Sequence, residues 1–499
     1  MLRSEQTRPV SLSMLAQAVG ASAPTVNVTG AVMDNRAVRP GDLFIAMPGA
    51  RVHAARFAGA AVEAGAAAVL TDAEGARIAG ELGVPAVVVP DVAAAAGTVA
   101  ALAYGEPAKH VRSFAVTGTN GKTTTTFMID SILRGLGAVT GLIGTVELRL
   151  ASQAVPARMT TPQPDELQAM LEVLVERGGT DVVMEVSSHA LAQGRTRPIR
   201  YSVAGFTNLT QDHLDFHETF EEYYAAKKTL FESENSQRCV ILVDDEYGKR
   251  LFSEVSAERS GVVSLSLGGS PGTAGWRVSD VVAAEHGHSF TLTSPSGETI
   301  STSVALPAMF NVANAALAIA MAAESGVPLA ELERALAGGV SPVVPGRMEV
   351  VSARPRVVVD FAHNEDALVK AMDALGSLQG RLIVVTGSAG ERDTGKRPAM
   401  ARVVSQRADI TVITDDDPHH EDPAAIRADL IAGIVPGAQW REIGDRREAI
   451  RWAVNEAAQE DTILLAGRGH ETAQNYGEYF VEIDDREVAR EAVKEKNER

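Results

Sequence analysis

The sequence predicts an α/β protein of three domains, each with a sheet at its centre. Hydrophobic residues make up 45% of the chain and aromatic residues only 5%, so that Ala, Val and Gly must fill the cores. This composition suits layered α/β domains better than an aromatic-rich β-sandwich. Short apolar segments alternate with helix-like segments along the chain, and the length of 499 residues exceeds one ordinary domain.

Three blocks divide the chain, and we place them at residues 1–108, 109–342 and 343–499. Glu106-Pro107-Ala108-Lys109 is the expected first connector, and Pro345-Gly346-Arg347 opens the third block. Apolar and helix-like segments alternate in the third block, which predicts a doubly wound, Rossmann-like sheet with ligands where the strands end. The expected strands there are 356–360, 382–386, 410–414 and 462–466.

Charge and cysteine content exclude several classes of protein. The formal net charge of −18 argues against general nucleic-acid binding, and it requires local basic residues to hold any anionic substrate. The single cysteine, Cys239, excludes a disulfide within the chain and a thiolate zinc cluster, and its apolar neighbours predict a buried strand thiol. The most membrane-like segment, 84–105, is interrupted by Pro85, Pro90 and Asp91. We therefore expect a cytoplasmic protein without a membrane span.

A Gly- and Thr-rich segment between an apolar strand and a helix-like stretch is the most informative motif. Residues 116–125 read Val-Thr-Gly-Thr-Asn-Gly-Lys-Thr-Thr-Thr, so loop N–H groups and a helix N-terminus could surround a polyphosphate. Lys122 would meet the outer phosphates, and a hydroxyl of Thr123 or Thr124 could reach magnesium. Val116 stands where the strict pattern has Gly, which disfavours an ordinary GTPase or motor, and the alternative is a turn that binds nothing. We expect a nucleoside triphosphate at Gly118, Thr119, Asn120, Gly121, Lys122, Thr123 and Thr124.

Further candidate ligands follow in the central block. Glu185 ends an apolar strand, where its carboxylate could bind magnesium or could be solvated. Asp212 and His213 are adjacent and cannot share a helix face, and no cysteine assists, so one magnesium ligand is a better interpretation than a zinc centre. Lys227 and Lys228 are adjacent in a helix-like segment; burying both would be costly, and one is expected to face solvent.

Together these motifs resemble those of the Mur ligase family. The resemblance rests on Thr-Gly-Thr-Asn-Gly-Lys-Thr-Thr, Met-Glu-Val-Ser-Ser-His, Asn-Leu-Thr-Gln-Asp-His and Tyr-x-x-x-Lys-x-x-Leu-Phe, and it covers the whole chain in order. It implies an N-terminal domain that binds a uridine substrate, a central domain that binds ATP, like P-loop ATPases, and a C-terminal domain that binds an amino acid. It also implies catalytic roles for Lys122, Glu185, His213 and Lys227. Lys227 would be carbamylated by carbon dioxide and would hold Mg²⁺ with Thr123, Glu185 and His213.

The same resemblance assigns substrate contacts. UDP-N-acetylmuramoyl-L-alanyl-D-glutamate is expected at Asn35, Thr160, Thr161, Ser187, Gln193 and Arg195. ATP is further expected at Asn311, Asn314, Arg347, Asp360 and His363, and the alternative for Arg347 is a hinge arginine paired with Glu349. This chain departs from the family at Asn35, where Ser is usual, at Met159, where Asn is frequent, and after His53, where Asp-Gly is missing.

The third amino acid is expected at Arg392, Asp416, Asp417, His419, Gly467 and Glu471. Family members that use meso-diaminopimelate have Asp-Asn-Pro-Arg where this chain has Asp-Asp-Pro-His at 416–419, and their arginine clamps the distal carboxylate. A neutral histidine beside an added carboxylate suits a lone ammonium better. The loop therefore favours L-lysine, then L-ornithine, with meso-diaminopimelate as a further alternative. Taken alone, the acidic residues would fit a solvated turn.

The implied reaction is an ATP-dependent amide ligation in peptidoglycan synthesis. The γ-phosphoryl group moves to the D-glutamate carboxylate, and the α-amine of a diamino acid attacks the acyl phosphate. No protein nucleophile is needed, because positioning, magnesium and cationic side chains carry the catalysis. Two alternatives remain: another ligase of the superfamily, such as a folylpolyglutamate synthase, and a paralogue that binds nucleotide or UDP-sugar without catalysis. We expect a monomer.

Overall fold

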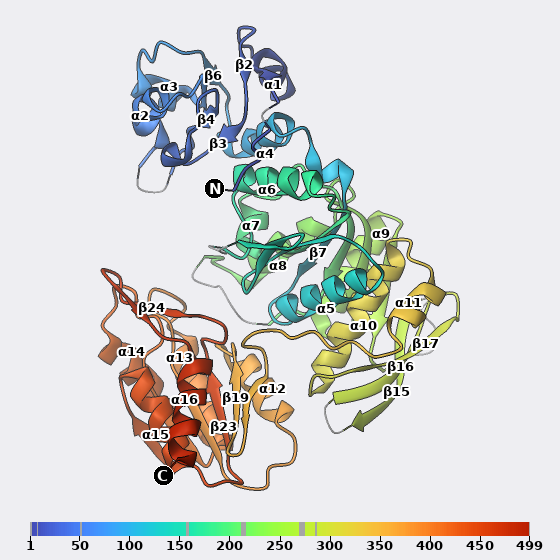
Figure 1. Ribbon diagram of the computed structural model, residues 1–499, viewed down its shortest axis with the longest axis vertical. Coiled ribbons are helices and arrows are strands. Elements are labelled where there is room, and N and C mark those ends of the chain that lie inside the picture. Colours follow the sequence, from blue (N-terminus) through green and yellow to red (C-terminus); the bar gives the residue numbers. More distant parts are fainter. Residues whose placement is uncertain are drawn as a thin grey trace.

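The computed structural model describes residues 2–6, 8–49, 52–155, 159–210, 216–268, 275–284 and 287–498. Within these ranges the chain forms three α/β domains, and their main sheets have four, eleven and six strands (Figure 1). The central domain lies between the other two. The prediction of three α/β domains is confirmed, and the boundaries at 108 and 342 stay predictions.

The first domain has a small parallel sheet in the order β3-β4-β5-β6, and β1 pairs with β2 beside it. Asp91 accepts a hydrogen bond from Ala94 N and so begins the alanine-rich helix α4, which packs on the sheet through its buried alanines. The elements are β1 (Val10–Ser11), α1 (Leu12–Ala18), β2 (Asn27–Val28), β3 (Ala31–Val32), η1 (Asn35–Ala37), β4 (Leu43–Ile45), α2 (Ala58–Glu63), β5 (Ala68–Thr71), α3 (Ala73–Ala79), β6 (Ala86–Val88) and α4 (Val92–Ala103).

The central sheet has a parallel middle in the order β8-β11-β7-β12-β13-β14. Side chains of β7 alternate between two cores: Phe114 and Val116 belong to the one that contains α5 and α10, and Ala115 belongs to the other. Cys239 is fully buried in β13, as predicted. The elements are β7 (Arg112–Thr117), α5 (Lys122–Gly135), β8 (Thr140–Ile143), β9 (Leu148–Leu150), β10 (Gln153–Val155), α6 (Pro164–Glu176), β11 (Asp181–Glu185), α7 (Ser188–Ala192), β12 (Tyr201–Phe206), α8 (Phe220–Lys228), β13 (Ser236–Leu242), α9 (Glu246–Glu258), β14 (Val262–Ser266), β15 (Trp276–Ala284), β16 (Gly287–Thr293), β17 (Thr299–Val304), α10 (Met309–Glu324) and α11 (Leu329–Ala335).

The C-terminal sheet, in the order β18-β19-β23-β20-β21-β22, is parallel except for β18. Val358 and Val384 face the core with α12 and α13, whereas Val359 and Val385 face the core with α15 and α16, as a doubly wound sheet requires. The elements are β18 (Glu349–Ala353), β19 (Arg356–Asp360), α12 (Glu365–Ala374), β20 (Leu382–Thr386), α13 (Lys396–Arg407), β21 (Ile410–Ile413), α14 (Pro423–Ile431), β22 (Trp440–Glu442), α15 (Arg446–Glu456), β23 (Thr462–Ala466), β24 (Ala473–Asn475), β25 (Phe480–Glu482) and α16 (Asp485–Asn497).

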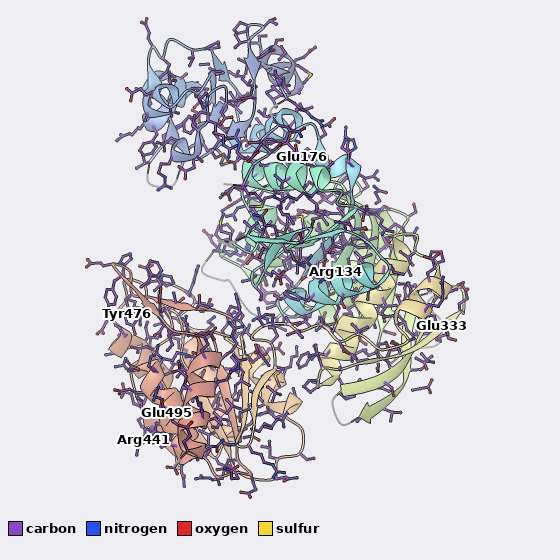
Figure 2. All side chains as sticks on the ribbon, in the orientation of Figure 1. Arg134, Glu176, Glu333, Arg441, Tyr476 and Glu495 are labelled. Carbon is purple, nitrogen blue, oxygen red and sulfur yellow. The ribbon has the colours of Figure 1, made fainter. Side chains whose placement is uncertain are left out.

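Loops at the carboxyl ends of strands in both larger sheets meet at one cleft. β7 and β11 lead into the loops that begin at Gly118 and Val186, and β19 and β23 lead into those that begin at Phe361 and Gly467. Side chains of the central and C-terminal domains extend into the space between the ribbons (Figure 2). Among the described residues, no helix is both long and apolar enough to cross a membrane.

Candidate active site

One cleft of about 580 Å³ collects most of the predicted site residues from the two larger domains. It is lined by the phosphate-loop residues Thr119 to Thr124, by the substrate residues Thr160, Thr161, Ser187 and Arg195, and by all six predicted amino-acid contacts. Its lining includes Glu185, Lys227, Asn311, Asn314, Arg347, Asp360, His363, Arg392, Asp416, Asp417, His419, Gly467 and Glu471. No predicted amino-acid contact falls outside this lining, and the cleft also has basic side chains, as an anionic substrate on an acidic protein requires.

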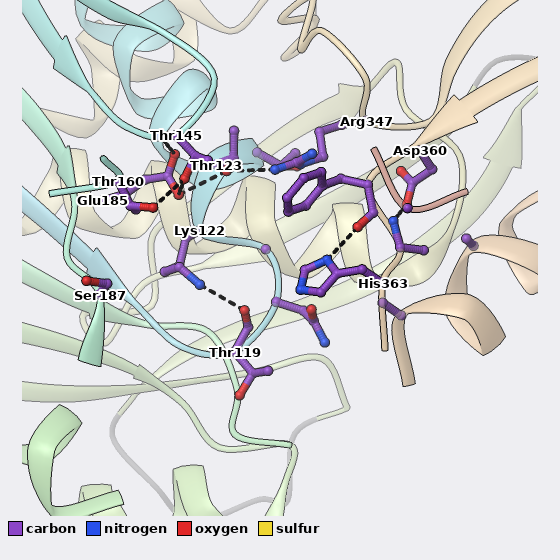
Figure 3. A pocket seen from close by; sticks show the side chains of 18 of the residues that line it. Thr119, Lys122, Thr123, Thr145, Thr160, Glu185, Ser187, Arg347, Asp360 and His363 are labelled. Atoms are coloured by element: carbon purple, nitrogen blue, oxygen red, sulfur yellow. Dashed lines mark hydrogen bonds between the residues drawn. The ribbon is translucent and has the colours of Figure 1, made fainter. Parts of the chain in front are cut away.

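The phosphate loop joins β7 to α5, as the sequence predicts. Lys122 Nζ donates to Gly118 O at 2.9 Å and to Thr119 O at 2.8 Å (Figure 3). The loop is held from β12: Asn208 Oδ1 accepts from Asn120 N, and Asn208 Nδ2 donates to Asn120 O, each at 3.0 Å. This reciprocal pair fixes the loop backbone before any ligand contact, which is the preorganisation that a phosphate site needs.

Glu185 ends β11 and is 1% exposed. Its Oε2 accepts from Thr123 Oγ1 at 2.9 Å, and its Oε1 accepts from Thr145 N at 2.9 Å (Figure 3). Thr161 Oγ1 donates to Glu185 O at 2.9 Å. A carboxylate beside a hydroxyl at the N-terminus of α5 is a hard oxygen pair that suits Mg²⁺ with phosphate oxygens as further ligands. Glu185 and Thr123 therefore fit the predicted metal role, whereas His213 lies outside the described residues.

The two adjacent lysines of α8 have opposite surroundings. Lys227 is 2% exposed, and its Nζ donates to Gly118 O at 2.9 Å and lies 4.5 Å from the centre of the Tyr223 ring. Lys228 turns outward to Glu254 and Glu258, at 3.0 and 3.1 Å. Only one lysine of the pair is buried, and Lys228 is the one on the solvent side, where one lysine was expected. The carbamate on Lys227 stays a prediction.

The predicted contacts for the UDP substrate lie in two places. Arg195 Nη1 donates to Thr161 O at 3.1 Å and contacts the sulfur of Met159 at 3.5 Å, so the variant methionine still touches this arginine. Gln193 is exposed and accepts from Arg195 Nε at 2.8 Å outside the cleft lining. Asn35 lies in η1 of the first domain, beyond the cleft.

The predicted nucleotide contacts of the C-terminal domain face the phosphate loop. Asp360 accepts from Met348 N and Ala362 N at 2.8 and 2.9 Å, and His363 Nδ1 contacts Phe361 O at 2.7 Å (Figure 3). Burial raises the pKa of Asp360, and the guanidinium of Arg347 opposes this shift. On α10, Asn311 Nδ2 donates to Pro307 O, and Asn314 Nδ2 donates to Asn311 Oδ1.

Arg347 extends toward the phosphate loop and is not paired with Glu349, so the alternative assignment does not hold, and its contact with ATP stays a prediction. The guanidinium lies 4.3 Å from the centre of the Phe361 ring and donates to Thr123 Oγ1 at 3.4 Å across the domain gap. Glu349 instead pairs with Arg490 at 2.8 Å and Arg486 at 3.7 Å. The two side chains diverge because β18 begins at Glu349, which turns that carboxylate toward α16.

The amino-acid end of the cleft contains a cluster of three carboxylates. Oxygens of Asp416, Asp417 and Glu471 lie within 4.8 Å of one another, and Arg468 pairs with Asp417 and lies 3.7 Å from Asp416 and 3.6 Å from Glu471. Burial and the neighbouring Asp416 raise the pKa of Glu471 to about 8, and burial also raises the pKa of Asp417. One guanidinium thus contacts three carboxyl groups, of which Glu471 keeps its proton at neutral pH.

The tautomer of His419 follows from its neighbours. Gly477 N donates to Asn475 Oδ1 at 2.8 Å, so the Asn475 Nδ2 group faces His419 Nδ1, at 3.0 Å. Because an amide Nδ2 is a donor only, Nδ1 of a neutral His419 must be the acceptor and Nε2 must carry the proton. The sequence indicated only a neutral histidine here, and the contacts of Asn475 and Arg468 with this loop were not predicted. Arg468 lies between the predicted contacts Gly467 and Glu471, but no spacing rule pointed to its partner.

Further contacts that the sequence did not predict join the C-terminal domain to the central one. Asn120 Nδ2 donates to Asp366 Oδ2 at 2.9 Å, and Lys370 on the same helix, α12, donates to that oxygen at 2.7 Å. His470 Nε2 lies 3.1 Å from Thr145 O, the residue whose N–H holds Glu185. Burial lowers the pKa of His470 to about 3, with the charge of Arg347 contributing, so the ring is neutral and donates from Nε2.

Two glycines touch where the linker enters the C-terminal domain. Gly346 and Gly469 both have positive φ, at 63° and 54°. A Cβ on Gly346 would lie 2.1 Å from Gly469 C and 2.2 Å from His470 N, which are backbone atoms that cannot turn aside. Only glycine suits this crossing, both for its φ and for its missing side chain.

Family models match each part of the fold. The Mur ligase family, catalytic domain matches residues 27–104, the Mur ligase middle domain matches 116–322, and the Mur ligase, glutamate ligase domain matches 346–469. With the three-domain fold and the phosphate-loop cleft, these matches define a ligase of the peptidoglycan pathway, and the chain belongs to the Mur ligase family.

Individual relatives make the likeness more specific. UDP-N-acetylmuramoyl-L-alanyl-D-glutamate--2,6-diaminopimelate ligase of Streptomyces coelicolor is 43% identical over 98% of both chains. UDP-N-acetylmuramyl-tripeptide synthetase of Leifsonia xyli is 41% identical over 94% of this chain and 92% of its own. A solved structure of UDP-N-acetylmuramoyl-L-alanyl-D-glutamate--2,6-diaminopimelate ligase is 31% identical to this chain. The match covers 98% of this chain and 100% of that one, with a TM-score of 0.66.

Proposed function

We propose that this protein is an ATP-dependent amide ligase that joins a diamino acid to the D-glutamate of UDP-N-acetylmuramoyl-L-alanyl-D-glutamate. The observation that carries the proposal is the shared cleft: the phosphate loop, the Thr160–Arg195 region and the carboxylate cluster line one cavity. A phosphoryl donor, an acceptor carboxylate and an amine could thus meet within it, which is the arrangement that ligation through an acyl phosphate requires. The named relatives support the same substrate class.

The chain's own residues supply positioning and charge. Lys122 and Arg347 would stabilise negative charge on the transferred phosphoryl group, the former from the loop and the latter from across the gap. Thr123, Glu185, His213 and a carbamylated Lys227 would hold magnesium, which would supply positive charge beside the phosphates of ATP. Arg195 lines the cleft and would orient the substrate carboxylate, whereas Thr161, whose hydroxyl donates to Glu185 O, would hold this wall of the cleft to the end of β11. The predicted monomer and cytoplasmic location belong to this proposal.

The third residue is proposed to carry a distal ammonium. Asp416, Asp417 and Glu471 surround the guanidinium of Arg468, and an incoming ammonium would pair with this cluster and favour release of the proton that Glu471 keeps at neutral pH. L-Lysine follows from the exchange of arginine for His419, with L-ornithine as the shorter alternative. Two observations favour meso-diaminopimelate as a second candidate: the relatives named for 2,6-diaminopimelate, and the Nε2–H donor of His419, which could bind a carboxylate.

Phosphate release from ATP tests the proposal. We would supply UDP-muramoyl-dipeptide with L-lysine, L-ornithine or meso-diaminopimelate and identify the tripeptide product by mass spectrometry. Turnover with lysine or ornithine alone supports binding of the distal ammonium by the three-carboxylate cluster. Turnover with diaminopimelate supports binding of its distal carboxylate by the Nε2–H group of His419 instead. An absence of turnover with every acceptor would contradict the ligase assignment and favour a paralogue without catalysis.

A further inference from the structure

One face of α6, a helix of the central domain, is covered by the first domain. Polar side chains recur on it at helical spacing, at Asp165, Gln168, Glu172 and Glu176. Ala169, on the same side, is fully buried in the hydrophobic core of the first domain. At the far end of the helix, Ser4 Oγ donates to the Glu176 carboxylate at 2.5 Å, and Figure 2 labels Glu176 there. This helix is therefore the contact through which the two domains are held in register.

Asp165 begins the covered face and reaches into the first domain. Its side chain is 2% exposed, and its Oδ2 accepts from Met33 N at 2.8 Å. Its Oδ1 is buried with no hydrogen-bond partner in the described part of the chain. Burial raises the pKa of Asp165 to about 6, and the N-terminus of α6 favours the charged form. Burying the Asp165 carboxylate costs desolvation energy, and its bond to Met33 N links α6 to the backbone of the first domain at one defined point.

Both ends of this connection lead to predicted substrate contacts. Met33 runs directly into the turn capped by Asp34, which carries Asn35, the expected uridine contact. In the other direction, Thr161 lies four residues before Asp165 and is fixed to the central sheet through Glu185 O. Two prolines, at positions 162 and 164, restrict the short path between Thr161 and Asp165.

We propose that Asp165 is a positioning residue that fixes the uridine-binding turn of the first domain relative to Thr160 and Thr161, so that one UDP-muramoyl-dipeptide molecule can engage both at once. This rests on the proposed function, because the ligand must span both domains. Two half-sites on one rigid frame bind a bridging ligand with a high effective concentration, and this gain falls when their spacing becomes variable. A short ligand that contacts only the first domain should bind with an affinity that does not depend on the spacing of the two domains.

Calorimetric titration of the full-length protein with UDP and with UDP-muramoyl-dipeptide tests the proposal. Asp165→Leu removes the acceptor and replaces it with a larger, apolar side chain; we expect the affinity for the full substrate to fall about tenfold, the scale of a lost buried hydrogen bond to a charged group, with UDP affinity within about twofold of wild type. Asp165→Asn keeps an acceptor oxygen for Met33 N and should retain affinity within about threefold. The matched control is Asp445→Leu, which loses a helix N-cap at α15, away from the first domain.

Three outcomes would overturn the positioning role. Equal weakening of UDP and of the full substrate in Asp165→Leu would mean that the first domain itself is damaged, and unchanged binding of the full substrate would mean that the spacing is set elsewhere. A loss in Asp165→Asn as large as in Asp165→Leu would also contradict the role of the acceptor oxygen. The proposed function fails separately if the wild-type protein binds UDP-muramoyl-dipeptide no more tightly than UDP, and the inference would fail with it.

Discussion

Neighbouring lysines on α8 differ in what surrounds them, and this difference allows a matched test of the carbamate. Lys227 is buried against Gly118 O and the Tyr223 ring, whereas Lys228 pairs with surface glutamates. We expect Lys227→Ala to lower turnover by about 10²- to 10³-fold, the usual effect of removing one preorganised charged group. Lys228→Ala should stay near wild type, because exposed ion pairs contribute little.

Lys227→Arg separates the two roles of this side chain. Arginine keeps the positive charge and a donor for Gly118 O but cannot form the lysine carbamate. Turnover in Lys227→Arg as low as in Lys227→Ala would support the carbamate, and a ¹³C carbamate signal in wild-type protein supplied with labelled bicarbonate should be missing from both. High activity in Lys227→Arg would contradict it and assign the role to the cation.

Glu471 should make stability depend on pH. Because burial and Asp416 raise the pKa of Glu471 from 4.5 to about 8, the folded protein retains a proton that the unfolded chain releases. The contribution to stability is therefore fully present below pH 4.5 and is lost as pH rises through about 8. The variant Glu471→Gln lacks this titration, so its stability relative to wild type should increase between about pH 5 and pH 9. Urea unfolding at both pH values checks this; a difference that does not change with pH would refute the assignment.

At the scale of elements, parallel strands were the most predictable part of the fold. Strands β19, β20 and β23 begin and end where the apolar runs do, because strands buried on both faces are nearly continuous in hydrophobic residues. The antiparallel strands β15 to β17 were missed, since one face is exposed and its Ser and Thr residues interrupt the apolar pattern. An alternating pattern of this kind is short and is easily assigned to a loop.

The candidate site divides in the same way. The phosphate loop and the end of β11 could be placed from sequence because each is a local strand–loop feature with a fixed spacing. Contacts between distant segments could not be placed: Asn475 sets the tautomer of His419 from 56 residues away, and His470 reaches Thr145 across 325 residues. Hydrogen-bond partners of this kind depend on how domains dock, which leaves no periodic signal in the chain.

The loop that carries His470 and Glu471 joins two subsites. Glu471 faces the carboxylate cluster, and His470 donates to Thr145 O, next to the N–H that holds Glu185. We expect His470→Leu to reduce kcat about tenfold, in line with a lost buried hydrogen bond, whereas His470→Gln, which keeps an N–H donor, should fall less than threefold. Steady-state kinetics check this, with the exposed His110→Gln as control. Equal losses in His470→Leu and His470→Gln would contradict the donor role.

At the scale of the whole molecule, the described structure has cross-domain contacts on both sides of the phosphate site. Asp366 reaches Asn120 on one side, and Arg347 and His470 reach Thr123 and Thr145 on the other. We expect Asp366→Ala to lower the equilibrium constant for this arrangement of the domains about tenfold, the scale of one lost charge-assisted hydrogen bond. Small-angle X-ray scattering should then show a larger radius of gyration. Asp373→Ala, on the same helix but paired with Arg407, is the control; an equal change in both variants would contradict this interpretation.

Because Gly346 and Gly469 are in contact, a substitution in the linker at residue 346 should also affect the loop that follows β23. The backbones of the two glycines meet with no room for a methyl group at residue 346, where a Cβ would collide with the backbone of Gly469 and with His470 N. A saturation library at Gly346, selected for growth through this enzyme, should return glycine alone. Second-site mutations that suppress Gly346→Ala should arise in the loop at 467–471, far along the sequence, because the backbones of the two segments are in contact. The loop that is proposed to select the third amino acid could then change in sequence only where its contact with Gly346 allows.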